Sequence, residues 1–195
     1  MASPTKLTIA PLTPKRFADL EAIFNARGCA QARSCWCMAY RRAGPFTPPR
    51  GVRRTDANRA DFKTLVDEGL PAGVLAYRGK TPVGWLSLSP REHFARLERS
   101  PVMKPVDEKP VWSIICFVVP PEHRGQGVAK ALLYGAIKYA KEKGATLLEA
   151  YPVDRTKRSR DDDMWFGPKS LYDKAGFKEV ARRKPQRPVV RRKAG

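Results

Sequence analysis

Residues 118–129 read VVPPEHRGQGVA: the apolar end of a strand, a turn with two glycines, and the first residues of a helix. A glycine turn at a helix start presents unpaired backbone N–H groups, and the helix dipole adds partial positive charge there. Gly125 and Gly127 leave room for a phosphate to approach the backbone, and Arg124 adds a charged donor. The turn therefore predicts a pyrophosphate-binding site.

Two other phosphate-binding patterns do not match this turn. The Walker A pattern ends in Gly-Lys-Ser/Thr, which is absent here. The dinucleotide fingerprint has three spaced glycines near the start of a βαβ unit, whereas this turn has two and lies late in the chain. A plain strand-to-helix connection without a ligand remains the alternative.

The segments on both sides of the turn have clear periodicities. Residues 111–119 are the most apolar run and are rich in β-branched side chains, which is typical of a central strand covered on both faces. After the turn, apolar residues recur at helical spacing from Val128 to Ala140, and Gly144 predicts the end of that helix. The sequence thus predicts a strand, a phosphate turn and a long helix.

The rest of the chain predicts short elements around this unit. We expect strands at 7–12, 74–77, 82–88, 147–151 and 177–181, and helices at about 14–24, 57–68 and 170–175. Residues 28–49 are expected to be irregular, and residues 90–110 a loop with a short helix around 92–97. No repeat or linker interrupts the pattern, so we expect one α/β (α+β) domain with a mixed sheet flanked by helices.

Two motifs resemble the GCN5-related N-acetyltransferases, the GNAT family. Residues 124–129, RGQGVA, fit the family fingerprint Arg/Gln-x-x-Gly-x-Gly/Ala on the turn between a central strand and a long helix. Residues 170–177, SLYDKAGF, are similar to the family's closing Leu-Tyr-x-x-x-Gly-Phe segment. The resemblance implies a mostly antiparallel central sheet over residues 1–183 and an acyltransferase that uses acetyl-CoA (coenzyme A) as its co-substrate.

The resemblance also assigns residues to the coenzyme site. They lie at the strand end, in the turn, at the helix start and in the closing segment: Phe117, Val118, Val119, Arg124, Gly125, Gln126, Gly127, Val128, Ala129 and Tyr172. It implies direct transfer of the acetyl group, in one ternary complex, to a primary amine of a small molecule or a protein. The backbone N–H of Val119 would stabilise the oxyanion, and the hydroxyl of Tyr172 would protonate the departing thiolate. A tyrosine that only packs is the alternative for Tyr172.

The general base is not evident. The central strand offers only Ser113 and Cys116 as polar positions, and Glu122 lies in the phosphate turn. Glu149 lies on the next strand and can face either way, and Glu92 with His93 lie in a loop that can reach the cleft; each is explained better as a surface residue. A catalytically silent acyl-CoA-binding module is therefore a second hypothesis.

Residues 34–42 read SCWCMAYRR and contain two of the four cysteines. A Cys-x-Cys spacing without a second pair or a nearby histidine is poor for a tetrahedral metal site, so no metal is expected. In the family this region borders the acceptor pocket, and we expect Trp36, Met38 and Tyr40 to line it. Their alternation fits a half-buried strand equally well.

The only acidic cluster, Asp161 to Asp163, precedes Met164 and Trp165. We expect this run and Trp165 to attract a cationic amine near the coenzyme; a solvated loop is the alternative.

Composition and charge limit the class of protein. The chain has 195 residues, 42% of them hydrophobic, which is enough for one sizeable core. A net charge of +19 favours polyanionic partners such as coenzyme A, nucleotides, nucleic acid or acidic membrane surfaces. Residues 184–195 are predicted to be a disordered basic tail. Few aromatic residues alternate with the basic ones there, which argues against nucleic-acid recognition by stacking, the third hypothesis.

The sequence contains neither an apolar run long enough to span a bilayer nor an apolar signal core. We therefore expect no membrane partner, a cytoplasmic protein and reduced cysteines. A homodimer is compatible with the sequence, but no residue pattern encodes one.

Overall fold

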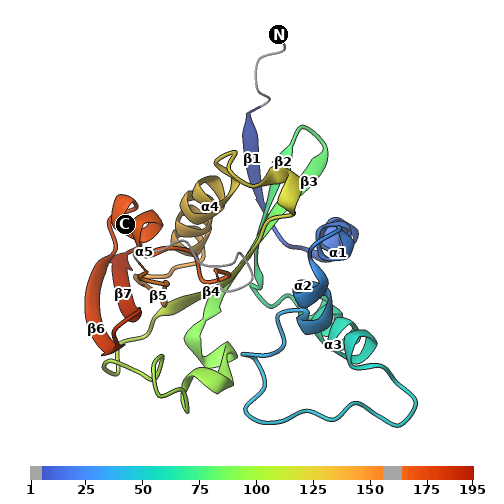
Figure 1. The fold of residues 1–195 in the computed structure, drawn as a ribbon, viewed down its shortest axis with the longest axis horizontal. Coiled ribbons are helices and arrows are strands. Elements are labelled where there is room, and N and C mark those ends of the chain that lie inside the picture. Colours follow the sequence, from blue (N-terminus) through green and yellow to red (C-terminus); the bar gives the residue numbers. More distant parts are fainter. Residues whose placement is uncertain (1–5, 156–163) are drawn as a thin grey trace.

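The computed structural model describes residues 6–155 and 164–195, and their centre is a seven-stranded sheet in the order β1-β2-β3-β4-β5-β7-β6 (Figure 1). Neighbouring strands are antiparallel except for β4 and β5, which are parallel. The predicted α+β domain with a mostly antiparallel sheet is confirmed. The strands are Leu7–Pro11 (β1), Gly73–Arg78 (β2), Thr81–Pro90 (β3), Trp112–Val118 (β4), Leu147–Ala150 (β5), Lys178–Lys184 (β6) and Arg187–Lys193 (β7).

Helices cover both faces of this sheet (Figure 1). On one face lie α1 (Phe17–Asn25), α2 (Ala30–Cys35) and α3 (Arg54–Asp67), which share a core with Leu75, Trp85 and Val118. On the other face lie α4 (Val128–Glu142) and α5 (Lys169–Lys174), which share a core with Leu86, Ile114 and Phe117. The alternation of side chains along β3 and β4 thus supplies both cores.

The strands β4 and β5 separate after a short parallel pairing. Their register runs from Trp112 opposite Leu148 to Ile114 opposite Ala150, whereas β4 continues to Val118. A bulge in the β3–β4 pairing lies at the same level, because Ser87 faces Cys116 and Leu88 faces Ile114. Bulges bend a strand and disrupt its ladder. Beyond Ile114, β4 has no pairing with β5, and the Phe117 N–H instead donates to the Trp165 carbonyl oxygen at 2.7 Å.

The predicted disordered tail at 184–195 is wrong. Residues 187–193 form β7, which inserts between β5 and β6, and Val189 and Val190 are completely buried. The basic side chain of Arg191 binds carboxylates from distant parts of the chain, Glu149 and Asp107. This long-range pairing compensates the charge of Arg191, which belongs to a segment whose local sequence resembles a solvated tail.

The region predicted to be irregular, residues 28–49, contains one short helix, α2. It ends at Trp36 and Cys37, which are the described non-glycine residues with positive φ, 47° and 55°. The predicted loop at 90–110 contains two 3-10 turns, Arg91–His93 and Ala95–Leu97. The other predicted elements lie within a few residues of their expected places.

Candidate active site

The glycine turn after β4 forms an open helix start. Gly125 and Gly127 have φ values of 71° and 79°, and a Cβ atom at either position would meet nothing within 4 Å. Helix α4 has neither a capping side chain nor an acidic residue in its first turn. Its first N–H groups and the dipole of a 15-residue helix therefore face open space. Arg124 holds the turn in place by donating from Nε to the Val119 carbonyl oxygen at 2.9 Å.

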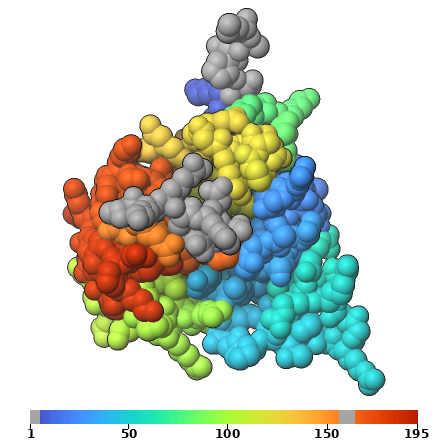
Figure 2. Space-filling model, in the orientation of Figure 1, coloured from blue at the N-terminus to red at the C-terminus, as the bar shows by residue number. Residues whose placement is uncertain are grey.

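This helix start opens into a pocket of about 830 Å³. Most of the described lining comes from three parts of the chain: residues 28–40 from α2 and its surroundings, residues 115–130 from β4 and the turn, and residues 153–155 and 164–168 before α5. Figure 2 shows the yellow turn before α4 meeting the blue N-terminal segment on the surface of the molecule. A Cβ atom at Gly28 would lie 2.6 Å from Pro121 Cγ, so the first two parts meet closely because residue 28 is a glycine.

The pocket brings together most residues predicted for the coenzyme. Those that line it are Phe117, Val118, Val119, Arg124, Gly125, Gly127, Val128 and Ala129. Gln126 lies outside, because its side chain donates to the Glu122 carbonyl oxygen at 2.7 Å and accepts from Arg78 Nη1 at 2.6 Å. Its amide therefore ties the turn to the β2–β3 hairpin.

Tyr172 is not placed at the pocket, which contradicts its assignment as general acid. Its side chain is completely buried, and its hydroxyl donates to the Phe166 carbonyl oxygen at 2.9 Å. Its ring packs edge-on against Phe117 and Phe177. Burial raises the pKa of the phenol, with a smaller contribution from Cys116. The structure supports the alternative, a tyrosine that packs and makes one buried hydrogen bond.

On the acceptor side of the pocket, two of the three alternating residues that were predicted to line it are buried in the core instead. Tyr40 and Trp165 line the pocket as expected, but Trp36 and Met38 do not. Trp36 is 1% exposed and lies between Phe17, at 5.9 Å between ring centroids, and Phe24, at 5.0 Å. The large apolar side chains at 36 and 38 enter the core because burying them contributes most. The smaller side chains at 35, 37 and 39 face the pocket.

The side chains considered as general bases lie elsewhere. Glu149 is completely buried and binds the guanidinium groups of Arg91, at 2.8 Å, and Arg191, at 2.7 Å. Ser113 hydrogen-bonds to Tyr151, and His93 to Ser89. Glu92 and Glu122 are exposed and do not line the pocket.

The pocket walls are cationic. Arg96, Arg124, Lys130 and Arg155 line the pocket, and none of the described lining residues is an aspartate or a glutamate. The acidic run at 161–163 lies outside the described residues, so its predicted role stays a prediction. The cationic walls suit the phosphates of coenzyme A.

Sequence reasoning missed the cysteines of this pocket. Cys29, Cys35, Cys37 and Cys116 all line it, although Cys116 is far from the other three in the sequence. The signal was the SCWC motif itself, in which small polarizable residues alternate with large apolar ones. Across the described parts of the chain, no group of three or more histidine, cysteine or acidic side chains could hold a metal ion.

None of the helices in the described residues is long and apolar enough to span a bilayer.

Comparisons with known proteins agree with this geometry. The model of the acetyltransferase (GNAT) family matches residues 36–162, while no curated protein matches the chain. Solved structures resemble it over nearly its whole length. An acetyltransferase from Thermus thermophilus is 19% identical with a TM-score of 0.52, covering 98% of this chain and 99% of that one. The PaiA N-acetyltransferase from Thermoplasma acidophilum, solved in complex with coenzyme A, is 18% identical with a TM-score of 0.51, covering 96% and 99%.

A third solved structure is YncA from Salmonella typhimurium, a putative acetyltransferase with its cofactor acetyl-CoA. It is 16% identical with a TM-score of 0.53, and the match covers 97% of this chain and 94% of that one. Identities this low show the shared fold.

Proposed function

The chain belongs to the GNAT family of acetyltransferases, and from this we propose that it transfers the acetyl group of acetyl-CoA to a primary amine of a small molecule or a protein. The observation that carries the proposal is the glycine turn at the start of α4, which opens into the large cationic pocket. Two related folds were solved with coenzyme A or acetyl-CoA, which supports the same co-substrate here.

The residues at the turn fit a pyrophosphate. The absence of side chains at Gly125 and Gly127 leaves the backbone N–H groups accessible, and positive φ at both positions is tolerated by glycine. Arg124 and Lys130 add positive charge on either side of the helix start. When bound, acetyl-CoA supplies an activated thioester, and this chain's task is to hold and orient it.

We place the reacting end of the pocket at the end of β4. Val119 lies just beyond the last residue of β4 paired with β3, and we propose its N–H as a donor to the oxyanion. Tyr40 and Trp165 would form part of the wall against which the amine lies. The resemblance implies direct transfer in a ternary complex, which requires a group that removes a proton from the amine. No carboxylate of the described pocket lining can do so.

Calorimetric titration with acetyl-CoA at near-physiological salt tests the proposal. ATP serves as a control, because so basic a protein binds polyanions non-specifically. The variant Gly127→Glu places a carboxylate in the phosphate turn and should weaken acetyl-CoA binding at least about tenfold, which corresponds to about 1.4 kcal/mol. Release of free thiol in the presence of an amine panel then separates an enzyme from a silent coenzyme-binding module.

The variant Gly144→Glu is a matched control. Gly144 lies just beyond the other end of α4, its φ is 84°, and a Cβ atom there would also meet nothing within 4 Å. The two variants therefore share the backbone strain and the charge change, but only Gly127→Glu lies at the pocket. Equal binding by both variants, or equal binding of ATP and acetyl-CoA by the wild-type protein, would refute the coenzyme site.

A further inference from the structure

The acceptor side of the pocket is built around Tyr40. Its ring packs edge-on against Phe166, with 5.7 Å between the ring centroids, in a small core that also contains Ile115. Val119 and Val128, at the coenzyme turn, pack into a different core. Tyr40 therefore marks the part of the pocket away from the start of α4, where the acceptor and not the coenzyme phosphates would lie.

Two arginines flank this tyrosine. Arg96 lines the pocket, its backbone N–H donates to the Tyr40 carbonyl oxygen at 3.1 Å, and its guanidinium lies 5.8 Å from the centre of the Tyr40 ring. The guanidinium of Arg187 lies 4.3 Å from the centre of the Phe166 ring. Its Nη2 donates to the Tyr151 carbonyl oxygen at 3.4 Å, whereas its buried Nε has no partner in the described part of the chain. Neither arginine forms an ion pair with a described acid.

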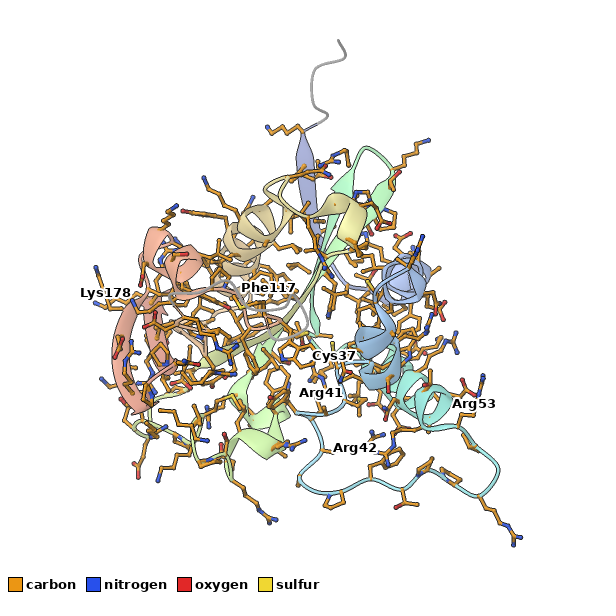
Figure 3. The ribbon with its side chains drawn as sticks, viewed as in Figure 1. Cys37, Arg41, Arg42, Arg53, Phe117 and Lys178 are labelled. Atoms are coloured by element: carbon orange, nitrogen blue, oxygen red, sulfur yellow. The ribbon has the colours of Figure 1, made fainter. Side chains whose placement is uncertain are left out.

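A third arginine, Arg41, adds a buried positive charge to the same region. All three nitrogen atoms of its guanidinium are buried and have no hydrogen-bond partner among the described residues. The group lies over the rings of Phe94, at 4.6 Å, and Phe62, at 5.6 Å. Figure 3 shows it next to Cys37, which lines the pocket. Burial lowers the pKa of Arg41 to about 10, against the effect of Cys37, so the group is cationic at neutral pH.

Buried arginines elsewhere in the described structure have acidic partners. Arg91 and Arg191 are each 8% exposed. The first binds Glu149 at 2.8 Å and Glu98 at 3.1 Å, and the second binds Glu149 at 2.7 Å and Asp107 at 2.8 Å. Such pairing is usual because an uncompensated buried charge is costly. The three arginines of the acceptor side have no such partner among the described acids, so their charge favours an anion in the pocket.

The phenol of Tyr40 adds a neutral donor beside these charges. Burial raises the pKa of Tyr40, and this effect outweighs the opposing effects of Arg187 and Arg96. The phenol is therefore protonated at neutral pH, and its O–H makes no hydrogen bond to a described residue. A guanidinium and a neighbouring O–H can together donate to both oxygens of a carboxylate.

We propose that the amine acceptor is an amino acid, whose carboxylate binds to Arg96 and to the phenol of Tyr40. The inference rests on the proposed function and adds the class of acceptor to it. The forked donors of a guanidinium match a carboxylate, whereas a diamine or another purely cationic amine is repelled. Arg41 and Arg187 strengthen the attraction from behind, because charges that are partly buried are screened less by water and salt.

Matched acceptors test this proposal on the full-length wild-type protein. Glycine, β-alanine and γ-aminobutyrate place the carboxylate at increasing distance from the amine, and phenylalanine adds a ring for Tyr40 and Trp165. Each is compared with its amide, which replaces the carboxylate by a neutral group of nearly the same size. Thiol release at saturating acetyl-CoA gives kcat/KM. The best carboxylate acceptor should exceed its amide at least about tenfold, a difference of about 1.4 kcal/mol. The amide has the less basic amine, so reactivity alone favours the opposite order.

The variant Arg96→Gln should reduce that ratio to about one, mainly by raising the KM of the carboxylate acceptor. Arg99→Gln is the matched control, because Arg99 lies three residues further along, is exposed and does not line the pocket. It removes the same charge and should keep the ratio. If Arg96 served only the fold, its variant would lower kcat/KM for the carboxylate and the amide alike, and the unchanged ratio would refute its role in binding.

The possible results separate this inference from the proposed function. If amides or the diamine putrescine are acetylated as well as the carboxylates or better, the amino-acid acceptor is refuted and the acetyltransferase stands. If acetyl-CoA binds but no acceptor reacts, the same acceptors are titrated calorimetrically into the protein saturated with coenzyme A. Carboxylates that bind, and that bind more weakly to Arg96→Gln, support the inference, and absence of binding refutes it. If calorimetry detects no preference for acetyl-CoA, both proposals fail.

Discussion

At the scale of single residues, burial decides whether a polar side chain serves the pocket or the fold. The phenol of Tyr172 and the carboxylate of Glu149 are both completely buried, and each has internal hydrogen-bond partners. Buried polar groups with satisfied hydrogen bonds rigidify a core, and their loss is costly. Both residues had been candidates for proton transfer, and both are instead expected to affect stability.

Tyr172→Phe should lower stability and leave the turnover number unchanged. The substitution removes the hydroxyl that donates to the Phe166 carbonyl oxygen, and leaving that oxygen unpaired costs about 1–3 kcal/mol. Tyr134→Phe is the control, because Tyr134 is exposed and also donates to a backbone oxygen, that of Lys174. Thermal unfolding and amine acetylation are measured on both variants. A large drop in turnover for the Tyr172 variant alone would restore its role as an acid.

Glu149→Gln should destabilise the protein by about 3–5 kcal/mol, because it leaves the buried guanidinium groups of Arg91 and Arg191 without their shared carboxylate. Glu98→Gln removes a second, half-exposed carboxylate from the same Arg91 and should cost about 1 kcal/mol or less. Urea unfolding of both variants measures the difference. Equal effects would mean that the Glu149 network contributes little to stability.

At the scale of elements, the local sequence predicts a segment correctly when all the signals for that segment lie within it. The strand, glycine turn and helix at 111–144 were predicted because periodicity and turn chemistry are contained within the segment itself. The strand β7 was not predicted, because its sequence, RPVVRRK, is basic and contains no acid, and it therefore resembles a solvated tail. Its Arg191 is paired with Glu149 and Asp107, which lie 42 and 84 residues away. No local pattern encodes such a pairing.

The two sides of the pocket differ in the same way: the coenzyme side can be predicted from local sequence, and the acceptor side cannot. The coenzyme side follows from one continuous motif, and the residues at the turn lie where that motif predicts them. The acceptor side combines α2, β4 and the segment before α5, so its composition depends on how these elements pack. Along residues 35–40, the prediction placed buried side chains in the pocket, because alternation alone does not show which of the two alternating sets of side chains is buried. The set that contains the larger apolar side chains, Trp36 and Met38, is the buried set, so side-chain volume indicates which set enters the core.

Val190→Asp tests whether β7 is part of the fold. Val190 is completely buried and pairs with Ala150 of β5 and Glu179 of β6, so a carboxylate there should cost at least about 4 kcal/mol. Val180→Asp is the matched control on the adjacent strand β6, where the side chain is 42% exposed and the expected cost is about 1 kcal/mol or less. The two variants are compared by urea unfolding. A disordered tail would make Val190→Asp the milder change.

At the scale of the whole molecule, the charge distribution separates specific from non-specific binding. The 38 lysines and arginines exceed the 19 acids by the net charge of +19, so any polyanion is attracted. The pocket concentrates part of this charge at a shaped site, with Arg124 and Lys130 beside an open helix start. Much of the basic C-terminal segment is ordered in β7, and its residue Arg191 is already paired with acids. A flexible arm that wraps nucleic acid is therefore not available from that strand.

Salt should distinguish the two kinds of binding. Exposed charges are screened within about 8 Å at physiological ionic strength, and the affinity for a single-stranded nucleic acid falls by a power law of salt with a slope of about −0.7 for each phosphate contact. Acetyl-CoA also uses backbone N–H groups and the apolar wall of the pocket, so its affinity should fall less steeply. Titrating the wild-type protein with a short single-stranded oligonucleotide and with acetyl-CoA, each at several salt concentrations, measures both slopes. Gly127→Glu should weaken acetyl-CoA binding at every salt concentration and leave the oligonucleotide slope unchanged. A shallow slope for the oligonucleotide, with tight binding at high salt, would instead favour nucleic acid as the protein's partner, because screening removes binding that rests on surface charge alone.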